Sequence, residues 1–183
     1  MNIFRANVGA IAGIAMIAGA MVGCSNSNKA PDVSANIRTA LDQAGLKDVS
    51  ENQDRDKGVV TLTGHVAGDA DKAQAESIAR SIAVGEVVAN QIAVLPPGGE
   101  GDAKKINSDV DKGIENNLDA ALVKSGFEHD VKYDVKNGVV TLSGNVDSQS
   151  KRAAAERIAA AVPNVQQTVN ELQVKDQKAT SSH

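Results

Sequence analysis

The sequence predicts an α+β fold built from two tandem domains, each with the element order α-β-β-α-β. The segment Lys57–Gly64 recurs 80 residues later as Asn137–Gly144, and 14 of the 37 positions aligned from Gly58 to Val94 are identical. Within each copy, apolar residues show a helical period in two segments and a strand-like pattern between them. A three-stranded mixed sheet with both helices on one face is the simplest way to bury these stripes.

A signal peptide is predicted at residues 1–23. An uncharged stretch rich in Ala and Gly runs from Val8 to Val22, after a short segment carrying Arg5. A helix needs about 20 apolar residues to span a bilayer, so this stretch is short for a membrane helix. It has the length of the apolar part of a secretory signal.

Cys24, the only cysteine of the chain, ends this stretch in the segment Met21–Cys24. The segment resembles the bacterial lipobox, which implies acylation of Cys24 and cleavage before it. Two or more acyl chains anchor a protein stably at a membrane. Ala18–Ala20 also fits ordinary signal cleavage after Ala20, which would leave a soluble protein with a free thiol.

The first helix of each copy has an apolar face, and Gly45 or Gly126 follows it as a stop signal. The second helix is expected to begin near Asp69 or Ser148, which are both favourable N-cap residues. The apolar positions of the first helices are Val33, Ile37, Ala40, Leu41 and Ala44 in one copy and Val110, Ile114, Leu118, Ala121 and Leu122 in the other.

The strands are clearest in the second copy, where apolar and polar residues alternate over residues 131–135. The counterpart at residues 49–53 is polar and gives a weak signal. Asn137 and Gly138 form a strong hairpin turn signal, because both tolerate positive φ. The second strands are expected at 59–63 and 139–143. The closing strands are expected to end with residues 90–94 and 170–174.

These elements predict the organisation of the whole chain. Domains this small bury only about 60% of their unfolded surface, so we expect marginal stability, improved if the two copies pack together. The predicted parts are a lipoprotein signal peptide (1–23), a tether (24–31), a first domain (32–95), a Pro/Gly linker (96–107), a second domain (108–175) and a polar tail (176–183).

Composition argues against several kinds of chemistry. Nineteen basic against 23 acidic residues give a net charge of −4, so the chain has no basic field for nucleic acid. One cysteine and three histidines far apart in sequence give no metal-ligand pattern, and no cofactor motif is present. Glu76 and Glu156 are expected on a solvated helix face, paired with Lys72 and Arg152. We therefore predict no enzyme, no cofactor and no metal site.

The residues Gly138–Val146 and Val165–Val174 carry a family resemblance. Together with the preceding helices, they make the chain similar to the BON domain over residues 32–95 and 108–175. A secretion signal followed by two such domains resembles the osmotically inducible periplasmic protein Y family, and the lipobox adds a resemblance to dual-BON outer-membrane lipoproteins. The resemblance implies non-enzymatic binding to phospholipid or envelope surfaces and a role in envelope integrity under osmotic or envelope stress.

The resemblance also directs attention to the first helix of the second domain, expected over Ser108–Lys124, as a membrane-contacting element. Its acidic residues outnumber its basic ones, which opposes binding to anionic lipid. Burial of Leu122 and Phe127 in the core is the alternative for those two residues. The candidate contact residues are Lys112, Leu122, Val123 and Phe127.

The resemblance to lipoproteins of enterobacterial type, in which Ser rather than Asp after the cysteine implies sorting to the outer membrane, gives the periplasmic face of that membrane as the expected location, since Ser25 follows Cys24. A soluble periplasmic protein is the alternative. The expected partner is a phospholipid surface. Docking onto an envelope protein and a chaperone-like role under osmotic stress remain competing functions.

Overall fold

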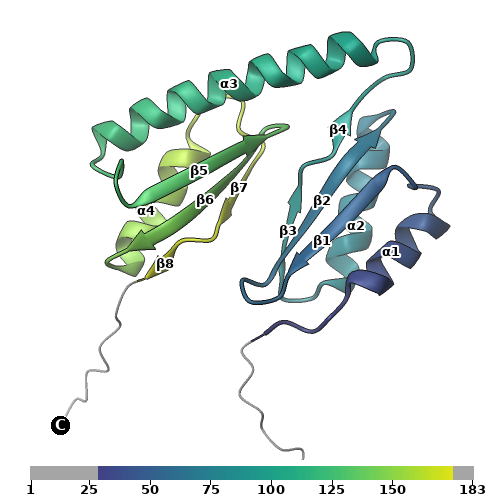
Figure 1. The fold of residues 1–183 in the computed structure, drawn as a ribbon, viewed down its shortest axis with the longest axis horizontal. Coiled ribbons are helices and arrows are strands. Elements are labelled where there is room, and N and C mark those ends of the chain that lie inside the picture. Colours follow the sequence, from purple (N-terminus) through teal and green to yellow (C-terminus); the bar gives the residue numbers. More distant parts are fainter. Residues whose placement is uncertain (1–28, 175–183) are drawn as a thin grey trace, which may run out of the picture.

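The computed structural model describes residues 29–174, and its two domains repeat one element order (Figure 1). The first domain contains α1 (Ser34–Gln43), β1 (Val49–Asp54), β2 (Val59–Val66), α2 (Asp69–Ile82), β3 (Val87–Asn90) and β4 (Ala93–Val94). The second contains α3 (Glu100–Lys124), β5 (Val131–Lys136), β6 (Val139–Val146), α4 (Gln149–Ala160), β7 (Gln167–Asn170) and β8 (Gln173–Val174). The predicted α+β fold with two mixed sheets is confirmed.

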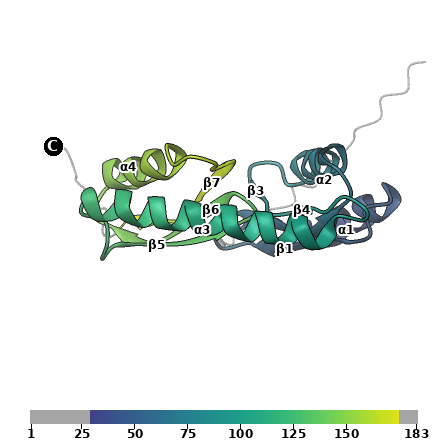
Figure 2. The ribbon, with the colours of Figure 1, turned by 90° about the horizontal axis from the view of Figure 1, so that it is seen from above.

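The two sheets share one topology. In the first, β1 runs antiparallel to β2, while β3 and then β4 run parallel to it on its other side. The second sheet repeats this arrangement with β5, β6, β7 and β8. Figure 2 shows α2 and α4 on the same side of the sheets.

Each domain has its own core between its sheet and its two helices. In the second domain, Ile114, Leu118 and Leu122 of α3 meet Val140 and Leu142 of β6. Small residues on the second helices, such as Ala155 and Ala159, are fully buried and let these helices lie close to the sheet. The equivalent core of the first domain is Ile37, Leu41, Leu46, Val49, Val60, Leu62, Val66, Ala75, Ala79, Ala83, Val88 and Ile92.

A glycine near the end of each central strand permits a close backbone approach. Gly64 and Gly144 have φ of +104° and +123°, which L side chains rarely adopt. A Cβ atom there would lie 2.0 Å from the carbonyl oxygen of Asp48, or 2.3 Å from that of Asp130. Only glycine fits, which explains why the repeated segments Gly58–Gly64 and Gly138–Gly144 both end in glycine.

The largest difference from the sequence prediction is the length of α3. It begins at Glu100 rather than Ser108, so much of the expected Pro/Gly linker is helical. The turn Pro96–Gly99 is closed by a hydrogen bond from the Gly99 amide to the Pro96 carbonyl (3.0 Å). Beyond it, Ala103, Lys104 and Lys105 are good helix formers, and acidic residues in the first turn complement the helix dipole.

The closing strands also differ from the prediction, because each is broken into two short segments. The Asn90 side chain accepts a hydrogen bond from the Ile92 amide (3.4 Å), and Asn170 does the same for Leu172 (3.2 Å). An Asn side chain that binds the backbone two residues ahead turns the chain locally. The ladder is therefore interrupted between β3 and β4 and between β7 and β8.

Of the two predicted N-caps, one is confirmed and the other is wrong. Ser148 caps α4, because its Oγ accepts a hydrogen bond from the Lys151 amide (3.2 Å). Asp69 is instead the first residue of α2, and the preceding Gly68, which has no side chain to cap with, occupies the N-cap position.

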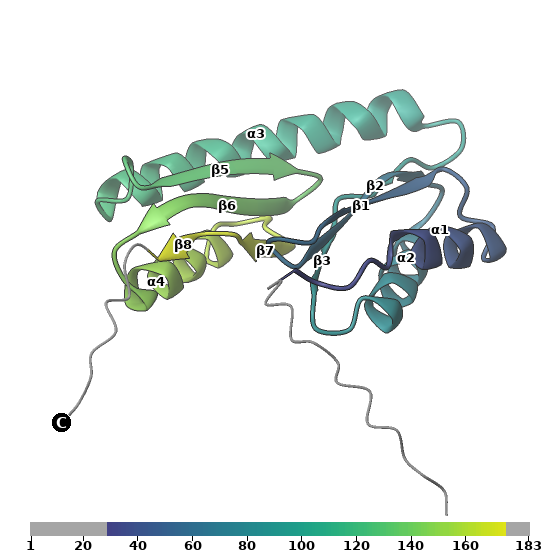
Figure 3. The same cartoon turned by 60° about the horizontal axis from the view of Figure 1, so that its bottom comes forward.

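The two domains meet through the edges of their sheets. β3 and β7 face each other at the centre of the molecule, as Figures 1 and 3 both show. The first half of α3 extends past its own domain and contacts β4 of the other. The expectation that the copies pack together is borne out.

Candidate functional site

The junction between the domains is built from the same positions of both copies. Val59, Ala89, Val139 and Val169 form a separate buried cluster, and each is at most 5% exposed. Val139 lies 80 residues after Val59, and Val169 lies 80 residues after Ala89. The contact is therefore self-complementary, as in a two-fold symmetric dimer.

The Gln167 side chain of β7 bridges to the backbone of β3. The Gln167 amide group donates to the Val88 carbonyl (2.7 Å) and accepts from the Asn90 amide (3.1 Å). It therefore satisfies two backbone groups on the otherwise unpaired edge of β3. We call these two hydrogen bonds the Gln167 clamp. The equivalent position in the first domain is Val87, whose apolar side chain cannot make such bonds, so the first domain has no matching clamp on β7.

Two further polar contacts join the domains. The Asn137 side chain donates to the Gln91 carbonyl (2.9 Å), and Lys57 forms an ion pair with Glu171 (2.7 Å). The hydrogen bond with Glu171 raises the pKa of Lys57 above 10.5. The ion pair is thus fully formed at neutral pH and is lost only as the pH rises through that raised pKa.

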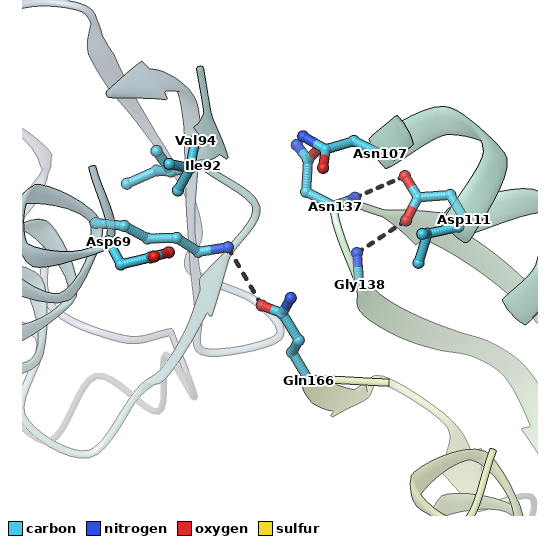
Figure 4. Close-up of a pocket in the computed structure, with 10 residues that line it drawn as sticks. Asp69, Ile92, Val94, Asn107, Asp111, Asn137, Gly138 and Gln166 are labelled. Carbon is cyan, nitrogen blue, oxygen red and sulfur yellow. Dashed lines mark hydrogen bonds between the residues drawn. The ribbon is translucent and has the colours of Figure 1, made fainter. Parts of the chain in front are cut away.

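A cavity of about 200 Å³ lies between the domains beneath α3 (Figure 4). The carboxylate of Asp111 accepts hydrogen bonds from the backbone amides of Asn137 and Gly138 (both 2.8 Å). On the opposite wall, Lys72 donates to the Gln166 side chain (3.4 Å). Burial lowers the pKa of Lys72. Because both of its oxygens accept backbone amides, the Asp111 carboxylate holds the β5–β6 turn in place.

Equivalent asparagines connect the closing strands to the second helices. Asn90 donates to the Lys72 carbonyl (3.2 Å) and to the Glu76 carboxylate (2.9 Å). Asn170 makes the same bonds to Arg152 and Glu156 (3.1 and 2.9 Å).

This finding corrects the expected pairing of the two glutamates. Glu76 forms its ion pair with Arg80 (2.6 Å) rather than with Lys72, and the Arg152 guanidinium donates to the Asn170 carbonyl (2.9 Å). The identical Asn and Glu positions in the repeat are the signal that predicts these contacts.

The structure separates the four candidate membrane-contact residues. Leu122 and Phe127 are 2% and 8% exposed and belong to the core of the second domain, so neither is available as a surface contact. That part of the sequence prediction is corrected, because α3 turns Leu122 toward its own sheet and Phe127, just after the helix, packs into the same core. Val123 is 51% exposed, and Lys112 is exposed. Cys24 lies outside the described residues.

The chain enters the first domain in a fixed position. The Ala30 amide donates to the Arg55 carbonyl (2.9 Å), and the Arg55 side chain donates to the Ala30 carbonyl (2.7 Å). The Gln53 side chain donates to the Pro31 carbonyl (2.7 Å) and to the Glu86 carboxylate (2.8 Å). Gln53 thus ties the entering chain to the loop between α2 and β3.

Within residues 29–174, no three His, Cys, Asp or Glu side chains are placed to hold a metal ion. No helix of this part of the chain is long and apolar enough to cross a membrane.

The fold and the junction define a protein of two tandem α+β repeats joined edge to edge. The BON domain matches residues 30–96 and 110–176, and the chain belongs to the BON domain family. It is 31% identical over 146 residues to osmotically-inducible protein Y of Escherichia coli (strain K12), with 78% of this chain and 71% of the relative covered.

Two solved structures of CdsD, a structural protein of the type III secretion system of Chlamydia trachomatis, are also similar. The first is its C-terminal domain, with a TM-score of 0.33 and 14% identity over 79% of this chain, which spans 66% of that domain's length. The second has a TM-score of 0.35 and 14% identity, with 79% of this chain and 92% of the other covered.

Proposed function

We propose that this protein is a non-enzymatic bacterial envelope lipoprotein that binds a phospholipid surface through its BON domains and supports envelope integrity under osmotic stress. The observation that carries the proposal is a pair of BON domains placed shortly after Cys24, the only cysteine, at the end of an apolar leader. The 31% identity to an osmotically inducible protein supports the role in osmotic stress. The proposed location is the periplasmic face of the outer membrane.

The proposed mechanism is retention by a short tether. Acyl chains on Cys24 hold the protein at the membrane. Only the residues between Cys24 and Lys29 separate the anchor from the first domain. A tether of this length keeps the domains at a high effective concentration near lipid headgroups, so weak contacts are sufficient.

The first test is the mass of the mature N-terminus from purified protein. A mass that matches acylated Cys24 supports the anchor. Cleavage after Ala20 with a free thiol would contradict it and favour a soluble periplasmic stress protein.

The second test is co-sedimentation of a 28–183 fragment with anionic or zwitterionic vesicles at low and moderate salt. This fragment lacks Cys24 and contains every described residue, so it binds only through the folded domains. Lys112→Glu and Val123→Asp test the surface predicted from the sequence, with Lys151→Glu on α4 as the matched control. If the fragment binds neither vesicle type, only the acyl chains on Cys24 attach the protein to the membrane.

A docking module for an envelope protein is the second candidate function. The exposed surface of α3 favours it, because Asp109, Glu115 and Asp119 are interspersed there with Lys105 and Lys112, and Ile106 is 60% exposed. An acidic helix face with an apolar side chain suits a basic protein partner better than an anionic bilayer. A fragment that binds no vesicles but is crosslinked in cells through α3 to one protein supports this candidate.

A further inference from the structure

We propose that the first domain contacts the bilayer through one surface beside the tether, and that α3 faces away from the membrane. This anchor-side surface comprises Lys29–Pro31, the β1–β2 turn (55–58), the α2–β3 loop (83–86) and Val87 at the start of β3. The inference rests on the proposed acylation of Cys24. It differs from the surface on α3 that the sequence predicts.

The first argument is that the entering chain is attached to the domain. Ala30 exchanges two hydrogen bonds with Arg55, and Lys29 forms an ion pair with Asp56 (3.1 Å). Gln53 binds both the Pro31 carbonyl and the Glu86 carboxylate. The tether therefore leaves the domain at this surface and cannot swing around it without breaking these contacts.

The second argument is the reach of the remaining chain. Five residue steps separate Cys24 from Lys29. Even fully extended, five steps span at most about 18 Å. The anchor-side surface therefore stays within that distance of the acylated residue. Figure 1 shows α3 along the opposite edge of the molecule from the point where the chain enters.

The third argument is an unusually exposed apolar side chain at this surface. Val84 is 81% exposed, the most exposed of the large apolar residues in the described part of the chain. It lines the same surface hollow as Lys29 and Ala30. Val87, the first residue of β3 directly after this loop, is 46% exposed. Apolar side chains on a loop tip are suited to the interfacial zone of a bilayer.

The charges of this surface are already paired. Lys29 pairs with Asp56, Lys57 with Asp54 (3.4 Å), and Arg55 lies 4.0 Å from Asp32. Each basic side chain of this surface thus has a carboxylate within 4.0 Å. With Asp32 and Asp54 beside it, four acidic residues face three basic ones, so anionic lipid is not required for contact. We expect the contact to be insensitive to salt and to depend on Val84.

The second domain lacks these features at the equivalent positions. Asn164 stands where the first domain has Val84, and Val135 stands where it has Gln53. Val135 is buried in the core. The exposed valine and the tether-binding glutamine are therefore specific to the domain that follows Cys24.

The test uses the full mature protein, purified from membranes and reconstituted in vesicles of phosphatidylethanolamine and phosphatidylglycerol. Val84→Cys is labelled with a fluorophore, and a quencher is placed on lipid headgroups. Ile106→Cys and Val123→Cys, near the start and the end of α3, are the matched exposed controls. The mass of each preparation reports whether Cys24 is acylated.

We expect the label at position 84 to lose most of its fluorescence, at low and moderate salt alike, while the label at position 106 keeps it. Strong quenching at 106 with none at 84 would overturn this orientation but leave membrane binding by the domains intact. Quenching at neither position on an acylated protein would overturn both. An unacylated Cys24 would show that the protein lacks this lipid anchor, and this inference would be overturned.

Discussion

Asn90 and Asn170 illustrate how a single side chain organises a strand, a turn and a helix. Each accepts a hydrogen bond from the backbone two residues ahead and donates two to the second helix of its domain. Asn90 is 4% exposed, and a buried amide group left without partners is costly. The asparagine therefore fixes where the closing strand breaks and how the helix sits on the sheet.

Tyr133 provides a residue-level test of the second domain. Burial and the nearby Asp119 carboxylate raise its pKa above 10.0. Its hydroxyl donates to that carboxylate (3.4 Å). A raised folded pKa means that this stabilisation is complete below pH 10 and is lost as the pH rises through the folded value.

We expect Asp119→Asn to lower the pKa of Tyr133 but to leave it above 10.0, because burial remains. The chain has one tyrosine and no tryptophan, so tyrosinate absorbance reports this residue alone. Asp134→Asn, an exposed change on the same strand, is the control. An unchanged titration in Asp119→Asn would contradict the contact.

At the scale of elements, α3 packs against both domains. Its second half supplies the core of its own domain through Ile114, Leu118 and Leu122. Its first half extends to β4 of the other domain, and Asp111 holds the β5–β6 turn from the middle. The helix thus connects the two domains as a continuous rod in place of the expected linker.

Gly113 lies inside this helix, where glycine costs about 1 kcal/mol relative to alanine. A Cβ atom there meets nothing within 4 Å. We expect Gly113→Ala to raise the free energy of unfolding by about 0.5–1 kcal/mol, measured by urea denaturation. Gly138→Ala should lower it, because its φ is +77° and a Cβ would lie 3.0 Å from the Gln166 side chain. Equal effects of both substitutions would contradict this account.

The elements also show what the sequence could predict. The repeat and its apolar periods were sufficient for the fold, the order of elements and the Asn137–Gly138 turn. They missed the start of α3, because Pro96, Gly98 and Gly101 resemble a linker. They left Leu122 and Phe127 as either core or surface, because an apolar residue in or just after a helix can pack on its own domain or on a partner.

The polar strand β1 was a weak signal for a physical reason. Gln53 stands where the second domain has a core valine, and its side chain holds the entering chain. Such a contact depends on residues far apart in sequence, so local pattern cannot reveal it. The clamp by Gln167 was invisible for the same reason.

At the scale of the whole molecule, the domain pairing depends on few polar contacts. Gln167 satisfies the Val88 carbonyl and the Asn90 amide, both in residues that are at most 4% exposed. We expect Gln167→Ala to lower the free energy of unfolding by about 1–3 kcal/mol, since it leaves buried backbone groups without partners.

The measurement is the urea midpoint of the 28–183 fragment, with Gln173→Ala on the exposed part of β8 as the control. If both variants unfold at the same midpoint as the parent, the clamp contributes nothing and the apolar cluster alone joins the domains.

The self-complementary junction also has an evolutionary consequence. A patch made of equivalent positions from both copies is what a two-fold homodimer of a single-copy ancestor would present. Duplication and fusion within one chain convert a dilution-sensitive association into an intramolecular one. The ancestral pairing would then persist even where the protein is present at low density on a membrane surface. Fusion also allows the two copies to differ, as they do where Gln53 stands opposite Val135 and Gln167 opposite Val87.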